Sequence, residues 1–190
     1  KDHEFIISGR SDSDYAKDTQ TRKSITGYRV LLEGAPVMFK SSTQKSVALS
    51  VCKAEQTSGV LCVQDMLYTK NVLELMGLKV KLPMVLEMDN KGAVDLANNW
   101  SVGGRTRHVD VRQCFLRELK ESKIMDIRWI KGTENEADVF TKNLDGPAFV
   151  KCIKNLVGQD VYMKILSTSE QGGCQEVADG TPHSNKILNN

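Results

Sequence analysis

The sequence predicts an α/β protein in which a mixed β-sheet carries helices on both faces. Short segments rich in strand-forming residues, punctuated by glycine and proline, fill roughly the first 50 residues. Strand and helix patterns then alternate up to about residue 157. Antiparallel strands followed by strand–helix alternation are typical of a mixed sheet that is covered by helices.

The N-terminal part is predicted to be a meander of antiparallel strands. Phe5, Ile7 and residues 9–12 indicate a first strand that runs into an acidic turn, and residues 26–33 (TGYRVLLE) indicate a second. Residues 36–40 and 45–49 are predicted to form further short strand pieces. Glycine and proline between these segments mark the turns of the meander.

A long helix and alternating elements follow the meander. Residues 50–76 contain no proline and carry apolar residues at helical intervals, with Ser50 as the predicted N-cap and Gly77 as the stop. Residues 84–88 and 125–129 predict strands, and we expect Trp129 to be a core residue because it alternates with polar neighbours. Residues 91–98, 106–121, 135–142 and 146–157 predict helices.

The composition is that of a globular domain with a polar tail. The chain is 40% hydrophobic and 26% charged, and its net charge of +2 neither requires nor excludes a nucleic-acid partner. Five cysteines without a C-x-x-C pair predict reduced thiols inside the cell. No apolar run approaches the roughly 18 residues of a membrane span. Because residue 1 is not methionine, we expect a fragment of a longer protein.

Residues 158–190 are predicted to form a mostly disordered tail. Most of this segment is polar and rich in glycine and serine, which predicts little burial of apolar surface. One short stretch differs, because residues 161–166 (VYMKIL) are mainly apolar and could dock on the domain as an extra strand or helix. Two hypotheses therefore stay open: the whole tail is disordered, or residues 161–166 dock on the domain.

Four carboxylates stand at the ends of predicted elements, where a sheet could gather them. These residues are Asp12, Glu55, Asp89 and Asp138. Oxygen ligands without histidine or cysteine suit Mg²⁺ or Mn²⁺ rather than zinc, and two such ions about 4 Å apart are a known device for phosphodiester cleavage. Taken singly, each carboxylate also fits a turn, a helix cap or a solvated surface. Spacing alone therefore leaves metal-dependent hydrolysis open.

The residues around these carboxylates form five longer blocks. They read SDSDYAKDTQTRKSITGY from residue 11, KSSTQKSVALSVCKAE at 40–55, DNKGA at 89–93, RTRHVDVR at 105–112 and GTENEADVFTK at 132–142. In their order and near their spacings, these blocks resemble the RNase H domain of copia-type (Pseudoviridae) LTR retrotransposon polyproteins. The resemblance covers roughly residues 5–157. It implies an RNase H-like fold with a five-stranded mixed sheet over residues 1–157.

The resemblance also implies a function for the four carboxylates. Asp12, Glu55, Asp89 and Asp138 match the metal ligands of an enzyme that uses two Mg²⁺ ions, with Mn²⁺ as an alternative, to cut the RNA strand of an RNA–DNA hybrid. The products would carry a 3′-hydroxyl and a 5′-phosphate. Asp14, two residues along the same strand, stays an alternative to Asp12 as the first ligand.

Basic residues near these blocks are candidate nucleic-acid contacts. The family's R-x-[KR]-H cluster matches Arg105, Arg107 and His108, although His108 could instead bond the backbone at a helix start. Arg22, Lys23 and Lys40 lie in predicted loops or at element ends, where they could hold phosphates or simply be solvated. The resemblance further implies an upstream reverse transcriptase domain in the same polyprotein, no membrane partner, and a place in the cytoplasm or in virus-like particles.

Several departures from the family pattern lead to a second hypothesis. The family's E-A-E-Y is Lys53-Ala54-Glu55-Gln56 here, and a usual histidine is Cys114. None of the departures removes an expected metal ligand, and no histidine is assigned to catalysis. The alternative is a degenerate copy that binds nucleic acid or a protein partner without cutting. An integrase is disfavoured because integrases use three acidic residues and lack the A-D-x-x-T-K motif.

Overall fold

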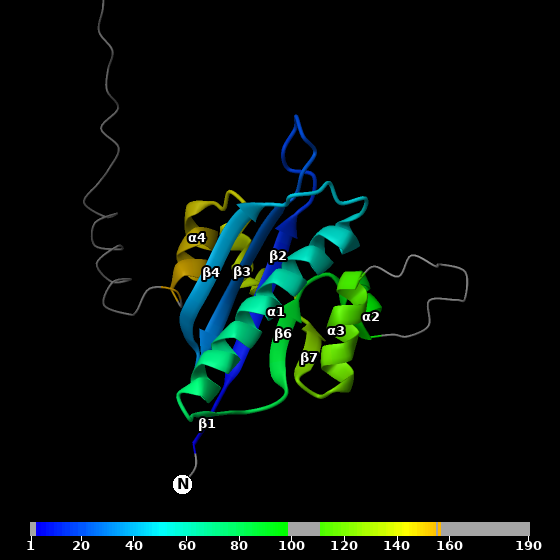
Figure 1. The fold of residues 1–190 in the computed structure, drawn as a ribbon. Coiled ribbons are helices and arrows are strands. Elements are labelled where there is room, and N and C mark those ends of the chain that lie inside the picture. The colour runs from blue at the N-terminus through cyan, green and yellow to red at the C-terminus, as the bar shows by residue number, and fades with distance from the viewer. Residues whose placement is uncertain (1–2, 99–110, 155, 157–190) are drawn as a thin grey trace, which may run out of the picture. The chain divides into compact units, whose positions relative to one another are not determined.

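The computed structural model describes residues 3–98, 111–154 and 156, and its centre is a mixed sheet (Figure 1). Five strands lie in the order β4-β3-β2-β6-β7. Their bounds are Ala35–Thr43, Ile25–Leu32, Ile7–Asp14, Met84–Met88 and Met125–Trp129. β2 pairs antiparallel with β3 and parallel with β6, and β6 pairs parallel with β7. This confirms the predicted five-stranded mixed sheet.

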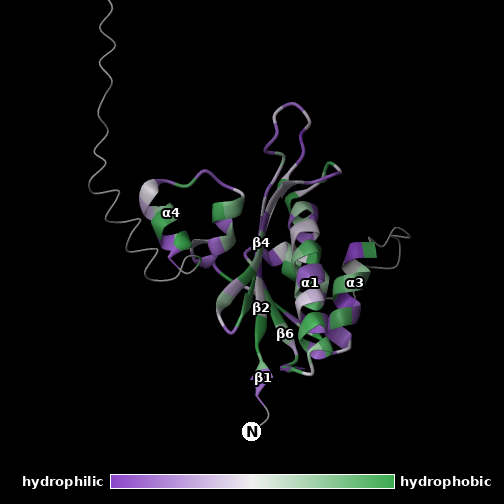
Figure 2. Ribbon diagram, turned by 60° about the vertical axis from the view of Figure 1, so that its left-hand side comes forward, coloured by the Kyte–Doolittle hydropathy of each residue, from purple (hydrophilic) through white to green (hydrophobic). Residues whose placement is uncertain are grey.

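Helices cover both faces of this sheet. Figure 2 shows the long helix α1 (Val51–Leu75) and α3 (Val111–Glu121) on one side, and α4 (Gly146–Ile153) on the other. The short helix α2 (Lys91–Asn98) follows β6 and contacts α1 and α3. As predicted, the Ser50 side chain caps α1 by accepting from the Lys53 amide, and Gly77 follows the helix with a φ of 77°.

The core lies between the sheet and α1, and one glycine sets how closely they pack. Val30, Leu86 and Met66 are fully buried there. A Cβ on Gly9 of β2 would lie 2.6 Å from the Cys62 sulfur and 2.7 Å from the Met66 sulfur, so any larger residue would force these side chains of α1 to shift. The contact fixes α1 against β2, and these two elements carry two of the predicted carboxylates.

Three predicted elements differ in the structure. Residues 45–49 form bends rather than a strand. The Gln44 side chain donates to the Thr26 hydroxyl and to the Ala54 carbonyl, which turns the chain toward α1 directly after β4. Residues 135–142, predicted as one short helix, contain the 3₁₀ helix η2 (Glu136–Phe140), which follows the 3₁₀ turn η1 (Gly132–Glu134). The last helix, α4, ends at Ile153 instead of residue 157.

Other elements extend or fall outside the predictions. The two-residue strands β1 (Glu4–Phe5) and β5 (Lys79–Val80) pair in parallel as a small second sheet. Residues 106–110 of a predicted helix lie outside the described residues, and so does the predicted tail, residues 158–190.

Two further expectations concern thiols and membranes. Four described cysteines are free, namely Cys52, Cys62, Cys114 and Cys152, in line with reduced thiols. Of the helices that the structure describes, none combines the length and the apolar character needed to cross a bilayer.

Candidate metal centre

Three carboxylates meet where two parallel strands end and the long helix begins. Ser11 of β2 is paired with Met88 of β6, so Asp12 and Asp89, the next residues, come to the same edge of the sheet. Glu55 lies in the second turn of α1, which packs on β2. One carboxylate oxygen from each of the three residues lies within 4.8 Å of the others. The structure thus brings together three of the four predicted ligands.

The three carboxylates have few partners of their own. Asp12 is 1% exposed, and its carboxylate accepts a bond from the Thr141 hydroxyl. One Glu55 oxygen accepts from the Ser13 amide at 3.2 Å. The other Glu55 oxygen is buried and finds no hydrogen-bond donor in the described part of the chain. A buried carboxylate oxygen without a donor is costly unless a cation neutralises it.

Burial and mutual repulsion disfavour the ionised carboxylates in the absence of a cation. Burial raises the pKa of Glu55 to about 8, and the neighbouring Asp12 and Asp89 add repulsion. Burial also raises the pKa of Asp89, with Asp12 as the second cause. The centre therefore carries more negative charge than its surroundings compensate. Three close carboxylates with an orphaned oxygen fit a hard divalent cation such as Mg²⁺ or Mn²⁺.

Asp138, the fourth predicted ligand, lies outside this three-carboxylate group. Its oxygen accepts a bond of 2.8 Å from the Lys142 ammonium, which also lies 3.3 Å from an Asp12 oxygen. Burial raises the pKa of the Asp138 carboxyl, and the bond from Lys142 opposes that rise. Asp14, the alternative to Asp12, pairs with Lys17 at 3.0 Å and is not a member of the group.

The helix η2, which carries Asp138, is anchored to the sheet by a partly buried ion-pair network. Glu136 accepts from Arg10 at 2.7 Å and also pairs with Arg29, whose side chain is only 3% exposed. Arg10 in turn bonds Glu87 of β6 at 2.7 Å. The Asn135 amide donates to the Ser11 carbonyl next to Asp12. These bonds tie the position of Asp138 to β2.

Trp129 corrects one prediction, because it lies at the rim of the centre and not in the core. The residue is 41% exposed, and its indole N–H donates to the Asp89 carbonyl at 2.9 Å. The Lys91 ammonium lies 4.5 Å from the ring centroid. β7 is the edge strand of the sheet, so the end of its alternating pattern has no neighbour to cover it. Alternation alone did not reveal this.

Three of the predicted nucleic-acid contacts fall on two separate surfaces. Arg22 and Lys23 lie in the turn between β2 and β3, which projects beyond the sheet in Figure 1. Lys40 is exposed on β4 and lines a groove of about 610 Å³ that is bordered by β4, α1 and α3. The other three, Arg105, Arg107 and His108, lie outside the described residues.

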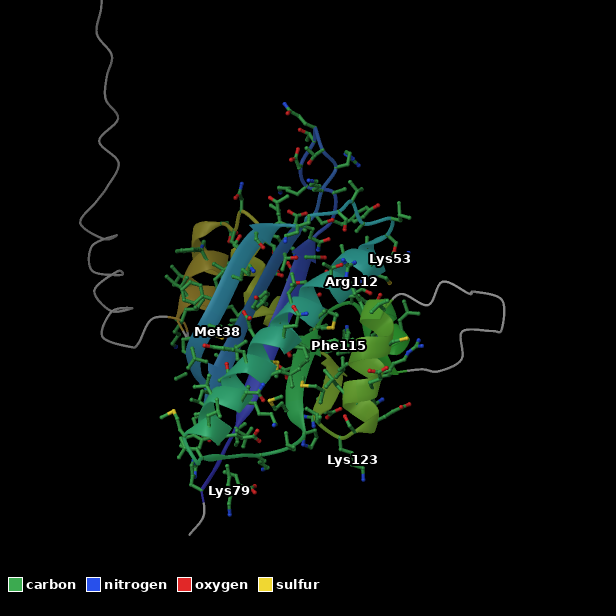
Figure 3. The ribbon with its side chains drawn as sticks, in the orientation of Figure 1. Met38, Lys53, Lys79, Arg112, Phe115 and Lys123 are labelled. Carbon is green, nitrogen blue, oxygen red and sulfur yellow. The ribbon has the colours of Figure 1, made fainter. Side chains whose placement is uncertain are left out.

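Basic residues that were not assigned from the sequence lie at the groove that Lys40 lines and near the carboxylates. Arg112 at the start of α3 lines the groove and donates to the Thr57 hydroxyl at 3.3 Å. A smaller pocket beside it is lined by Arg112 and Lys53, which Figure 3 shows near one another at the N-terminal end of α1. Lys142 was also missed, although its spacing of four residues from Asp138 could have indicated an ion pair on a helix.

Comparisons with known proteins identify relatives of most of the chain. No protein-family model matches it. It is 36% identical over 153 residues to the "Retrovirus-related Pol polyprotein from transposon TNT 1-94" of Nicotiana tabacum, covering 80% of this chain and 11% of that protein. It is 29% identical over 149 residues to the corresponding polyprotein from transposon RE1 of Arabidopsis thaliana, covering 78% of this chain and 10% of that protein. The chain therefore spans about one tenth of the length of these curated relatives.

Two solved structures resemble the fold. LC11-RNase H1, isolated from compost, matches with a TM-score of 0.53 at 13% identity, covering 78% of this chain and 99% of that one. A crystal structure of LC11-RNase H1 in complex with an RNA/DNA hybrid also gives a TM-score of 0.53, at 12% identity, covering 71% of this chain and 93% of that one. At identities this low, the two structures bear on the fold alone.

Proposed function

Because this chain has an RNase H-like fold and is homologous to part of the Pol polyproteins of copia-type transposons, we propose that it is a ribonuclease H. It would cut the RNA strand of an RNA–DNA hybrid internally, with two divalent metal ions, as part of a retrotransposon reverse transcriptase/RNase H polyprotein. The convergence of Asp12, Glu55 and Asp89, with carboxylate oxygens within 4.8 Å of one another, is the observation that carries the proposal.

The chain's own residues suit this chemistry. Asp12, Glu55 and Asp89 would hold one Mg²⁺ or Mn²⁺ ion, and Asp12 with Asp138 would hold a second. Bound divalent ions lower the pKa of water, so that it attacks at neutral pH, and stabilise the negative charge on the leaving oxygen. The packing of α1 on β2 and the ion pairs that tie η2 to the sheet hold the carboxylates in place. The site therefore needs little reorganisation during the reaction.

Substrate binding would rely on shape and backbone contacts. A hybrid is recognised through its wide minor groove, its 2′-hydroxyls and its phosphates, because its deep major groove cannot be read by side chains. We assign phosphate contacts to Arg22, Lys23 and Lys40, and to Arg105, Arg107 and His108 of the predicted basic cluster. Arg112 joins them because it lines the groove with Lys40.

The setting of the reaction belongs to the same proposal. As part of a longer Pol polyprotein, the chain would act beside an upstream reverse transcriptase domain, which produces RNA–DNA hybrids. We place this work inside the cell, in the cytoplasm or in virus-like particles.

A cleavage assay tests the proposal. A labelled RNA–DNA hybrid is incubated with the chain in Mg²⁺, in Mn²⁺ and in EDTA, beside a DNA duplex of the same sequence. We expect internal cuts in the RNA strand only, and only with a divalent ion. Asp89→Asn should abolish cutting and leave the circular dichroism spectrum unchanged. Its melting temperature in EDTA should stay the same or rise, because a repulsive charge is removed. Cutting by Asp89→Asn at the wild-type rate would refute the metal-centre assignment.

The same assay separates the enzyme from a degenerate copy. The second hypothesis rests on the departures from the family pattern, such as Lys53, Gln56 and Cys114. A chain that binds the hybrid in a filter or anisotropy assay, but does not cut it in either metal, would establish the non-cutting reading.

A further inference from the structure

The ammonium group of Lys142 lies next to two of the four predicted metal ligands. The Lys142 ammonium is 2.8 Å from an Asp138 oxygen and 3.3 Å from an Asp12 oxygen, so it bridges these two carboxylates. Asp12 is also one of the three residues whose oxygens converge on the other side. Asp12 therefore belongs both to the group of three carboxylates and to a pair with Asp138 that Lys142 bridges.

We propose that Lys142 is a positioning residue that acts as a built-in counter-ion of the centre. A divalent ion would bind first among Asp12, Glu55 and Asp89, and a second ion would bind at Asp12 and Asp138 only after displacing the ammonium. This inference rests on the proposed function, because it orders the filling of the same metal centre.

The surroundings of each half support this order. In the three-membered group, one Glu55 oxygen is buried and has no donor in the described part of the chain, so a cation gains a ligand without breaking a bond. On the Asp138 side, the oxygens already accept from Lys142, and a second cation would be repelled by the ammonium. A metal ion can therefore bind among Asp12, Glu55 and Asp89 without displacing a cation, whereas the Lys142 ammonium occupies the position between Asp12 and Asp138.

The Lys142 ammonium can move away from the two carboxylates. Its side chain is 39% exposed, so the ammonium can reach water by rotating its flexible stem. The backbone beneath it need not move, because η2 stays held by Glu136 on Arg10 and Arg29. Displacement is therefore a side-chain movement, and the binding of the second ion is the event that drives it.

Calorimetric titration of the full chain with MnCl₂, without nucleic acid, tests the inference. We expect two Mn²⁺ ions to bind the wild-type chain, the second at least about tenfold more weakly than the first. Lys142→Gln should raise the affinity for the second ion by about tenfold or more and for the first ion by less, because the ammonium contacts both ligands of the second ion but only Asp12 among the ligands of the first. Lys142→Arg keeps the charge and should retain the weak second site.

A matched control and a second readout make the result specific. Lys91→Gln removes the same charge two residues from Asp89, but its ammonium lies on the Trp129 ring, so both affinities should stay unchanged. In EDTA, Lys142→Gln should melt below the wild type because the carboxylates lose their counter-ion, and saturating Mn²⁺ should remove that difference. A merely structural lysine would lower both melting temperatures equally.

The outcomes separate this inference from the proposed function. If the wild-type chain binds no Mn²⁺, both fail. If it binds two ions with equal affinity, or if Lys142→Gln leaves the second affinity unchanged while Asp89→Asn abolishes the first, only the role of Lys142 is overturned. The wild-type and Lys142→Arg titrations decide the question even if Lys142→Gln does not fold.

Discussion

At the residue scale, burial favours the protonated form of the Glu55 side chain in the centre. It is 3% exposed, one of its oxygens lacks a donor within the described residues, and two neighbouring carboxylates repel its charge. The folded chain consequently binds the Glu55 proton more tightly than the unfolded chain does. The proton and a metal ion compete for the same oxygens, so protonation of Glu55 connects stability, metal affinity and pH.

We expect the metal-free chain to lose stability as the pH rises from about 5 to about 8. The folded-state pKa of about 8 lies above the ordinary value of 4.5. The contribution of Glu55 is therefore complete below the unfolded pKa and is lost as the pH rises through the folded one, with a slope of at most about 1.4 kcal/mol per pH unit. Urea denaturation in EDTA across this range measures the slope.

Two variants show whether this slope comes from Glu55. Glu55→Gln should flatten it, because the amide does not titrate. Glu118→Gln, which changes an exposed residue of α3, should leave it as in the wild type. Mn²⁺ affinity of the wild type should rise over the same pH range, as proton competition is removed. Equal slopes for Glu55→Gln and the wild type would contradict the assignment.

At the element scale, η2 is the piece whose position the sheet must fix. It packs on β3 and β2, on the face opposite to α1, and it carries Asp138. A Cβ built on Gly27 of β3 would lie 2.5 Å from a Thr141 methyl carbon and 2.8 Å from the Phe140 Cβ. Thr141 bonds Asp12 directly. The empty space at Gly27 therefore lets the end of η2 reach the centre.

Gly27→Ala should push η2 away from the sheet. Overpacking of a tight contact typically costs about 1–3 kcal/mol of unfolding free energy. Because the displaced segment carries Asp138, Thr141 and Lys142, Mg²⁺-dependent cleavage should fall more than stability predicts. Urea denaturation and the hybrid assay measure the two effects.

Gly146→Ala is the matched control for this variant. Gly146 begins α4, and nothing lies within 4 Å of the position of its added Cβ. This substitution should leave both stability and cleavage near the wild-type values. Wild-type behaviour of Gly27→Ala would mean that η2 adjusts freely and that its close contact with β3 does not position the centre.

At the scale of the whole molecule, basic residues lie toward both ends of the domain, but only one end carries the carboxylates. Lys53 and Arg112 lie toward the end where α1 begins, whereas Lys79 and Lys123 lie toward the opposite end (Figure 3). The carboxylates also lie where α1 begins. A hybrid bound to the catalytic side would therefore contact one group of basic residues and leave the other in solvent.

Binding of the hybrid should weaken and depend less on salt when Arg105 and Arg107 are both changed to alanine. Each lost phosphate contact lowers the slope of log affinity against log salt by about one unit, so a decrease of about two is expected. Fluorescence anisotropy over a series of salt concentrations measures it. The pair Lys79→Ala and Lys123→Ala, at the far end, should leave the slope unchanged. If the two double variants show the same dependence of affinity on salt, Arg105 and Arg107 do not contact phosphates and are ordinary solvated residues.

Truncation after residue 158 should cost little stability. The removed residues are mostly polar and carry no periodic apolar pattern, so they offer little surface to bury. The melting temperature of the truncated chain checks this expectation. Limited proteolysis adds a second measurement, because protection through residue 166 followed by cutting beyond it would show that residues 161–166 dock on the domain.

Local patterns in the sequence predicted most of the elements. The N-cap at Ser50, the stop at Gly77 and the apolar spacing between them determine α1, because each depends on residues within one or two turns. The wrong strand at residues 45–49 has the same origin, since local strand propensity cannot show that Gln44 turns the chain toward α1. The exposure of Trp129 likewise depends on β7 being an edge strand.

The sequence by itself determined the order of strands and helices and the presence of four carboxylates at their ends. Only the tertiary structure decided that Asp12, Glu55 and Asp89 converge, and that the Lys142 ammonium bridges Asp138 to Asp12. The reason is physical. Periodicity and capping act over a few residues, whereas the meeting of side chains 34 or more positions apart depends on strand register and on the packing of α1 and η2 against the sheet.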